Sequence, residues 1–115
     1  MNKIALLGAG LLLLLGSASV VVAEEHAAAA LEHANQAVMH GEAGHASMLV
    51  DHATEALKHA HAASDIAKGE AKTHIDASIK SLEVAIEHGK KGAGHEPIAT
   101  KAAEEAVDHL KAANK

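Results

Sequence analysis

Histidine recurs at intervals of seven residues along most of this chain. Ten of the eleven histidines belong to three runs with this spacing, and only His61 lies outside them. The runs are His26, His33 and His40; His45, His52 and His59; and His74, His88, His95 and His109. In the third run Ser81 and Ala102 stand where two further histidines would complete the spacing. Seven residues are close to two turns of α-helix, so histidines of one run that lie on the same helix share one face of it.

The histidine positions are also symmetric about two points in the chain. One centre lies between residues 42 and 43, and the other between residues 91 and 92. If the chain reverses direction at these points, symmetric residues lie at equal heights on two antiparallel helices. The pattern predicts two helical hairpins with five facing pairs, namely His26 with His59, His33 with His52, His40 with His45, His74 with His109, and His88 with His95.

Glycine and proline divide the chain into four stretches that favour helix. The expected helices span residues 24–40, 45–68, 70–88 and 98–113. Gly41, Gly69 and Gly89 end the first three of them. Pro97 suits the start of the fourth. Four helices with short connections predict an all-α fold, an up-down-up-down antiparallel four-helix bundle.

The heptad also predicts which residues are buried. If histidine takes position c of the heptad, the residue after the histidine is d, the fourth after the histidine is g and the fifth is a. Position g is mostly alanine. Position a holds Leu31, Val38, Val50, Leu57, Ile79, Ile86 and Val107; position d holds Ala27, Ala34, Ala46, Ala53, Ile75, Leu82, Ala103 and Leu110. We expect a core along a and d. Alanine at g lets hairpin partners approach, which leaves the histidines half exposed at the edge of that interface.

The amino-terminal residues are typical of a secretory signal peptide. Lys3 precedes an apolar stretch, and the small residues Val21 and Ala23, third-last and last before Glu24, suit cleavage after Ala23. Residues 1–23 are therefore expected to be the signal peptide, and residues 24–115 a single periplasmic domain. A cut after Ala18 and an uncleaved membrane anchor are the alternatives.

The composition of the processed chain, residues 24–115, limits the kinds of partner that it can bind. Losing Lys3 leaves nine lysines against fifteen acids, a net charge of −6 with neutral histidine, and there is no aromatic residue. Such a surface argues against nucleic-acid binding and suits small cations. The absence of cysteine excludes disulfides, thiolate metal sites and lipid attachment at cysteine. We expect a monomer that contacts no membrane after processing.

The histidines point to metal binding, because neutral imidazole is a common ligand of Cu(II), Zn(II) and Ni(II). Histidines seven apart on one helix are separated by about 10 Å, so an ion needs ligands from both helices of a hairpin. The candidate ligands are His26, His33, His40, His45, His52, His59, His61, His74, His88, His95 and His109. Four carboxylates lie four residues from a histidine and share its face, which makes them candidates to help: Glu55, Asp65, Glu70 and Glu105.

Metal preference follows from the ligand types. Cu(II) is expected to bind best, with Zn(II), Ni(II) or Co(II) possible. Met39 and Met48 alone offer sulfur after residue 23, which leaves little for Cu(I). Cleavage after Ala23 would also create the start Glu24-Glu25-His26, whose amine, two amides and imidazole can surround Cu(II) in a plane.

The whole chain resembles the small metal-binding protein (SmbP) family of periplasmic, histidine-rich four-helix bundles. The signal peptide, the absence of cysteine and repeats such as Asp51-His52-Ala-Thr-Glu-Ala-Leu carry the resemblance. It implies a monomeric periplasmic protein that takes up several Cu(II) ions and tolerates other divalent metals. Ser81 and Ala102 interrupt the repeat, which puts a site in the middle of the second hairpin in doubt.

Three functions are compatible with the sequence. The first is storage, scavenging or buffering of metal, which many similar half-exposed sites favour. The second is a pH-responsive structural or chaperone-like bundle with no specific metal role, loosened when its histidines are protonated. The third is an enzyme or electron carrier, which the sequence disfavours because no motif marks a single buried pocket.

Overall fold

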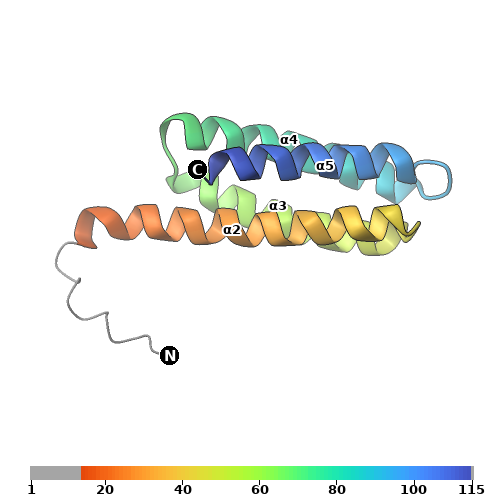
Figure 1. Cartoon of the computed structure of the whole chain (residues 1–115), viewed down its shortest axis with the longest axis horizontal. Helices are drawn as coiled ribbons and strands as arrows, with labels where there is room; N and C mark the ends of the chain where they lie inside the picture. The colour runs from red at the N-terminus through yellow and green to blue at the C-terminus, as the bar shows by residue number, and fades with distance from the viewer. Residues whose placement is uncertain (1–13, 115) are drawn as a thin grey trace, which may run out of the picture.

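Four helices form an antiparallel bundle in the computed structural model, which describes residues 14–114 and the side chains of residues 22–114. The helices are α2 (Leu14–Glu42), α3 (Ala46–Ile66), α4 (Gly69–Lys91) and α5 (Glu96–Ala113). Each helix packs against the one before it, and α5 returns to lie beside α2 (Figure 1). The up-down-up-down bundle predicted from the sequence is confirmed. In the described range no helix is long and apolar enough to span a membrane.

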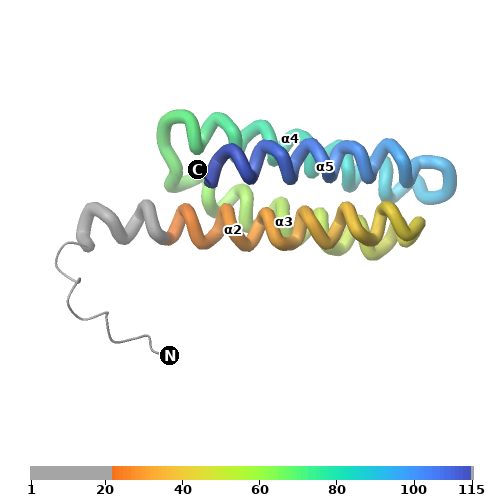
Figure 2. Tube along the Cα trace, viewed as in Figure 1, coloured from red at the N-terminus to blue at the C-terminus, as the bar shows by residue number. Residues whose placement is uncertain are grey.

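Two hairpins make up this bundle, α2 with α3 and α4 with α5. The contacts within each hairpin are more extensive than those between the hairpins. Both hairpin turns lie at one end of the bundle, and the α3–α4 connection lies at the other (Figure 2). Gly44, Gly92 and Gly94 in the turns adopt positive φ angles of 79°, 76° and 89°, which favour glycine because it has no Cβ.

The helix boundaries differ from the prediction at two glycines. Gly41 lies within α2 and Gly89 within α4, so neither glycine ends its helix. A Cβ on Gly41 would overlap Thr100 Oγ1 of α5 and lie 2.7 Å from Leu49 Cδ1 of α3, and one on Gly89 would lie 2.6 Å from Val50 Cγ2 of α3. Gly41 therefore permits close contact with α5 and α3, and Gly89 with α3, a tertiary role that the prediction of helix ends missed.

The amino-terminal end of α2 also differs from the prediction. The helix begins at Leu14, so the expected boundary after Ala23 falls inside continuous helix. Residues 1–13 of the expected signal peptide lie outside the described residues. At the other end of the chain, α5 starts at Glu96 with Pro97 in its first turn, as predicted.

The core follows positions d and g, and position a contributes less than predicted, because of its predicted residues only Val107 is buried. The fully buried g residues are Ala30, Ala37, Leu49, Ala56, Ala63, Ser78, Ala85, Ala99 and Ala106. The a residues Leu31, Val38 and Leu57 are only partly buried against that cluster. Small g side chains let hairpin partners approach until both are covered, whereas the larger a side chains line the wider contacts between hairpins. Most d residues, including Ile75, Leu82 and Leu110, are buried as expected, whereas Ala46 is only half-buried.

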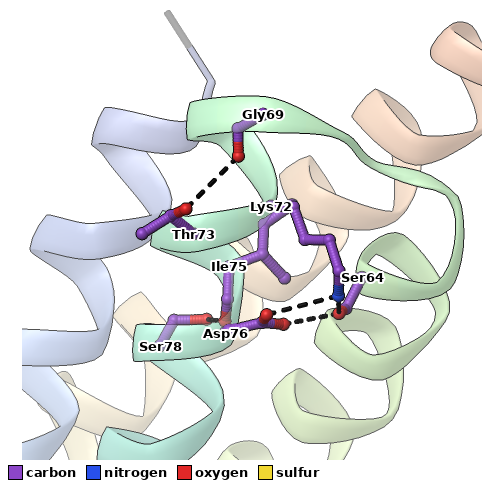
Figure 3. A network of polar contacts seen from close by, with 7 residues as sticks. All are labelled: Ser64, Gly69, Lys72, Thr73, Ile75, Asp76 and Ser78. Atoms are coloured by element: carbon purple, nitrogen blue, oxygen red, sulfur yellow. Dashed lines mark hydrogen bonds and ion pairs between the residues drawn. The ribbon is translucent and has the colours of Figure 1, made fainter.

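A polar network joins the two hairpins beside the α3–α4 connection (Figure 3). The Ser64 hydroxyl donates to Asp76 Oδ1 at 2.5 Å, and Lys72 Nζ lies 3.2 Å from Asp76 Oδ2. The hydrogen bond from Ser64 and the charge of Lys72 hold the pKa of Asp76 below its usual value. Because most of the buried core is alanine, which contributes little area, such contacts help to fix how the hairpins pack.

Candidate metal centre

The histidines of the first hairpin pair as the symmetry of the sequence predicts. The Nδ1 atoms of His26 and His59 are 3.1 Å apart, and those of His33 and His52 are 3.3 Å apart. The rings of His40 and His45 lie beside the turn with centroids 6.0 Å apart. The side chains of these residues are half-buried, except for His45, which is exposed. Each pair joins α2 to α3 across the edge of their interface.

Diagonal contacts connect these pairs into one column. The rings of His33 and His59 stack with centroids 5.9 Å apart, and those of His40 and His52 at 5.2 Å. Along the hairpin the order of contact is His26, His59, His33, His52, His40, His45. Six imidazoles therefore form a continuous zigzag rather than three separate pairs.

The diagonal contacts follow from the direction in which helical side chains lean. Side chains in a helix tilt toward its amino terminus. His33 on α2 thus leans away from the turn, and His59 on the antiparallel α3 leans toward the turn, so their rings meet. The symmetry of the sequence predicted the pairs at equal heights but not the diagonal contacts, which depend on this tilt.

The second hairpin holds two separate pairs. The Nδ1 atoms of His88 and His95 are 3.1 Å apart, and the rings of His74 and His109 have centroids 6.0 Å apart. Ser81 and Ala102 stand between the two pairs, and Ala102 is only 5% exposed. The pairs are separated by fourteen residues on each helix, or about 21 Å at 1.5 Å per residue. The predicted pairing is confirmed here without a connecting column.

One carboxylate joins the histidine column. His33, Glu55 and His59 each offer a ligand atom, and these atoms all lie within 4.8 Å of one another. Glu55 comes from the turn of α3 preceding His59, as its spacing of four predicts. Its carboxylate also lies 3.4 Å from Lys58 Nζ, in an exposed ion pair that contributes little to stability. A cation held by both rings would be partly neutralised by Glu55.

Four other predicted ligands lie apart from such a group. Asp65, Glu70, Glu105 and His61 are exposed. Across residues 22–114, none of the four joins a cluster of three potential ligands. Their helical spacing places them near histidines along one helix, but a metal site also needs a ligand from the facing helix.

The close pairs have a geometry that fits a shared ion. Imidazole nitrogen binds ions such as Zn(II) at about 2.0–2.1 Å, so two ligands about 90–110° apart lie roughly 2.8–3.4 Å from each other. The three Nδ1 separations of 3.1–3.3 Å fall in this range. Without metal, each pair can share one proton in an N–H···N hydrogen bond. An ion would replace that proton with little movement of either helix.

His52 occupies the middle of the column, and its environment favours the neutral ring. Burial lowers its pKa below the ordinary 6.5, and the neighbouring His40 and His33 lower it further. Asp51 and Glu55 oppose this shift but do not cancel it. The neutral form is the one that binds metal, so the column presents its central ligand ready for an ion.

The comparisons with known proteins agree with this chemistry. The sequence pattern of a family described as small metal-binding protein matches residues 1–113, nearly the whole chain. No curated protein matches at a significant level. Metal binding is thus supported by the family and by the paired histidines together. The chain belongs to the small metal-binding protein family.

Proposed function

We propose that this protein stores and buffers several Cu(II) ions in the periplasm, and that it is not an enzyme. The observation that carries the proposal is the set of imidazole nitrogens held 3.1–3.3 Å apart across both hairpins. These pairs repeat one arrangement instead of building one specialised pocket. Several similar, half-exposed sites suit uptake and release of ions better than catalysis at a single centre.

Cu(II) is the proposed cargo because its complexes with nitrogen and oxygen ligands are the most stable among the divalent first-row ions. Zn(II), Ni(II) and Co(II) fit the same ligands with lower affinity. The apolar stretch before Ala23 supports export to the periplasm, where a monomer would meet copper entering the cell. A partner that receives the metal would have to reach the histidine edge of a hairpin.

The proposed amino-terminal Cu(II) site makes a further demand on the fold. Residues Glu24-Glu25-His26 are helical, and His26 faces His59 at 3.1 Å between Nδ1 atoms. A planar site at a new terminus after Ala23 would require His26 to leave this pair. The two sites therefore compete for one imidazole.

The test is a Cu(II) titration of protein purified from the periplasm of a Gram-negative host, with its amino terminus located by mass spectrometry. Electron paramagnetic resonance at neutral pH should show several equivalents of nitrogen-bound Cu(II). Replacing His33 and His52 together by alanine should remove a class of sites, whereas His61→Ala, which changes an exposed histidine outside the runs, should not. Saturation at one equivalent would overturn the storage proposal.

A second function has its own supporting observation. Six neighbouring imidazoles in one column would repel one another once protonated, which suits a pH-responsive structural or chaperone-like bundle. This alternative predicts that acid exposes apolar surface and that Cu(II) has no effect on the melting temperature. A metal store predicts a melting temperature that rises with Cu(II), because the ion binds only the folded protein.

A further inference from the structure

One heptad position, which we call position f, separates the environments of the histidine pairs. Position f is the third residue after each histidine and lies on the same helix face, toward solvent. On α3 it is Met48 between His45 and His52, and Glu55 between His52 and His59. Glu55 already shares a cluster with His33 and His59. The residue at position f can therefore contribute a ligand to the column.

Met48 occupies the place equivalent to Glu55, one heptad closer to the turn. Moving one heptad toward the turn replaces His33 on α2 by His40, and His59 on α3 by His52. The two ring pairs have matching geometry: both stack, at 5.9 Å and 7° for the first pair and at 5.2 Å and 4° for the second. Because Met48 precedes His52 by four residues, as Glu55 precedes His59, the heptad gives the second pair a thioether at the position where the first has a carboxylate.

The exposure of Met48 is also consistent with a ligand role. Met48 is a large apolar side chain that is 42% exposed, although α3 has buried positions available. Methionine has three rotatable bonds, so its sulfur can turn toward neighbouring rings without moving the helix. His45 offers a fourth potential ligand, because the centroid of its ring lies 6.0 Å from the centroid of the His40 ring.

We propose that His40, His52 and Met48, with His45 beside them, form a site for a soft monovalent ion of the Cu(I) type. Thioether sulfur selects Cu(I), whereas carboxylate oxygen suits harder divalent ions. The column then has two kinds of site: the Glu55 cluster for divalent ions, and the Met48 cluster at the turn for the reduced ion. This site goes beyond storage of Cu(II), and His52 is its only ligand that also belongs to one of the three close nitrogen pairs.

Ag(I) is the probe for the test, because it has the softness and charge of Cu(I) but does not change oxidation state. Ag(I) is added to the full protein, and the methionine methyl groups are followed by NMR. The Met48 methyl signal should shift with the first equivalent. Met39, which is 65% exposed on α2 and does not occupy position f, is the internal control and should not shift at that stage.

Two variants separate the sulfur from the shape of the side chain. Met48→Leu keeps an apolar side chain of similar size and should weaken Ag(I) binding by about tenfold or more, whereas Met39→Leu should leave it unchanged. Met48→Glu should copy the Glu55 cluster, and so should lose Ag(I) affinity and retain or increase Cu(II) uptake. Circular dichroism checks that each variant is folded.

The outcomes distinguish this proposal from Cu(II) storage. A Met48 methyl signal that stays in place, or Met48→Leu binding Ag(I) as tightly as the natural protein, would overturn the soft site while leaving the Cu(II) titration untouched. Conversely, loss of the Cu(II) equivalents with an intact Ag(I) response would overturn storage alone.

Discussion

The two hairpins carry the same heptad but arrange their histidines differently. In α2–α3 six rings form a continuous column, whereas α4–α5 holds two pairs with Ser81 and Ala102 between them. The residues at position f also differ. Glu55 and Met48 flank the column, whereas exposed Val84 and Ile98 flank the pair at the second turn. The repeat therefore determines where ligand side chains can lie, and single residues that depart from it determine whether neighbouring histidine pairs are in contact.

In the first hairpin His33 and His52 each contact two other rings, so an ion bound to one pair would have further potential ligands next to it. In the second hairpin each ion has one pair and no next neighbour. We expect the first hairpin to bind in a coupled manner and the second to bind at independent sites.

The turn end of either hairpin can be disrupted at its buried helical glycine. Gly41→Ala would place a methyl group against Thr100 and Leu49, and Gly89→Ala would place one against Val50. Each should lower the free energy of unfolding by about 2–3 kcal/mol through overpacking, as measured by urea denaturation. Each variant should also perturb the neighbouring histidine, His40 for Gly41→Ala and His88 for Gly89→Ala.

Gly69→Ala provides the comparison for these two variants. Nothing lies within 4 Å of a Cβ there, but the φ angle is +64°, so only backbone strain of about 1 kcal/mol is expected. If all three variants lose the same stability, the close helix contacts are not the reason for glycine at positions 41 and 89.

Removing one histidine should have unequal effects in the two hairpins. His52→Ala takes away a ring that contacts both His33 and His40, whereas His88→Ala affects His95 alone. Because neighbouring sites are coupled, Cu(II) capacity should fall by about two ions for His52→Ala and by about one for His88→Ala. Isothermal titration calorimetry measures both. Equal losses would show that the column acts as separate pairs.

The interruption in the second hairpin can be filled. The double variant Ser81→His with Ala102→His should create a new rung and raise Cu(II) capacity by about one ion. Ala102 is only 5% exposed, so the added ring should cost about 1–3 kcal/mol of stability by crowding. The single variant Ser81→His is the control, and it should gain no ion because it lacks a partner. No gain in the double variant would mean that the α4–α5 interface excludes a facing pair.

The metal-free first hairpin should lose stability in mild acid. The pKa of His52 is lowered from 6.5 in the folded protein, so the unfolded chain binds its proton more readily. The contribution of this residue is therefore present above pH 6.5 and is lost as the pH falls through the lower, folded pKa. Thermal melts between pH 7 and 5 should show a shallower decline for His52→Gln than for the natural protein. His61→Gln is the control, and a decline as shallow in this variant would contradict the assignment to His52.

Much of the candidate site could be read from the sequence. Equal spacing along each helix and symmetry about two turns predicted all five histidine pairs, because an antiparallel hairpin maps sequence distance directly onto height. Glu55 could also be predicted as a ligand, because it precedes His59 by four residues and so shares its helix face. The diagonal contacts were not predicted, because they depend on the opposite tilt of side chains on facing helices.

The four helices, their antiparallel order and the positions available to the histidines follow from the sequence alone, because heptad spacing and helix-breaking residues act locally. Which residues are buried and which rings touch depends on the packing of the helices. Alanine at g allows hairpin partners to approach closely and shifts the core toward d and g, while Gly41 contacts α5 and α3, and Gly89 contacts α3, instead of ending their helices. These outcomes depend on how closely two helices approach, a distance set jointly by side chains far apart in the chain.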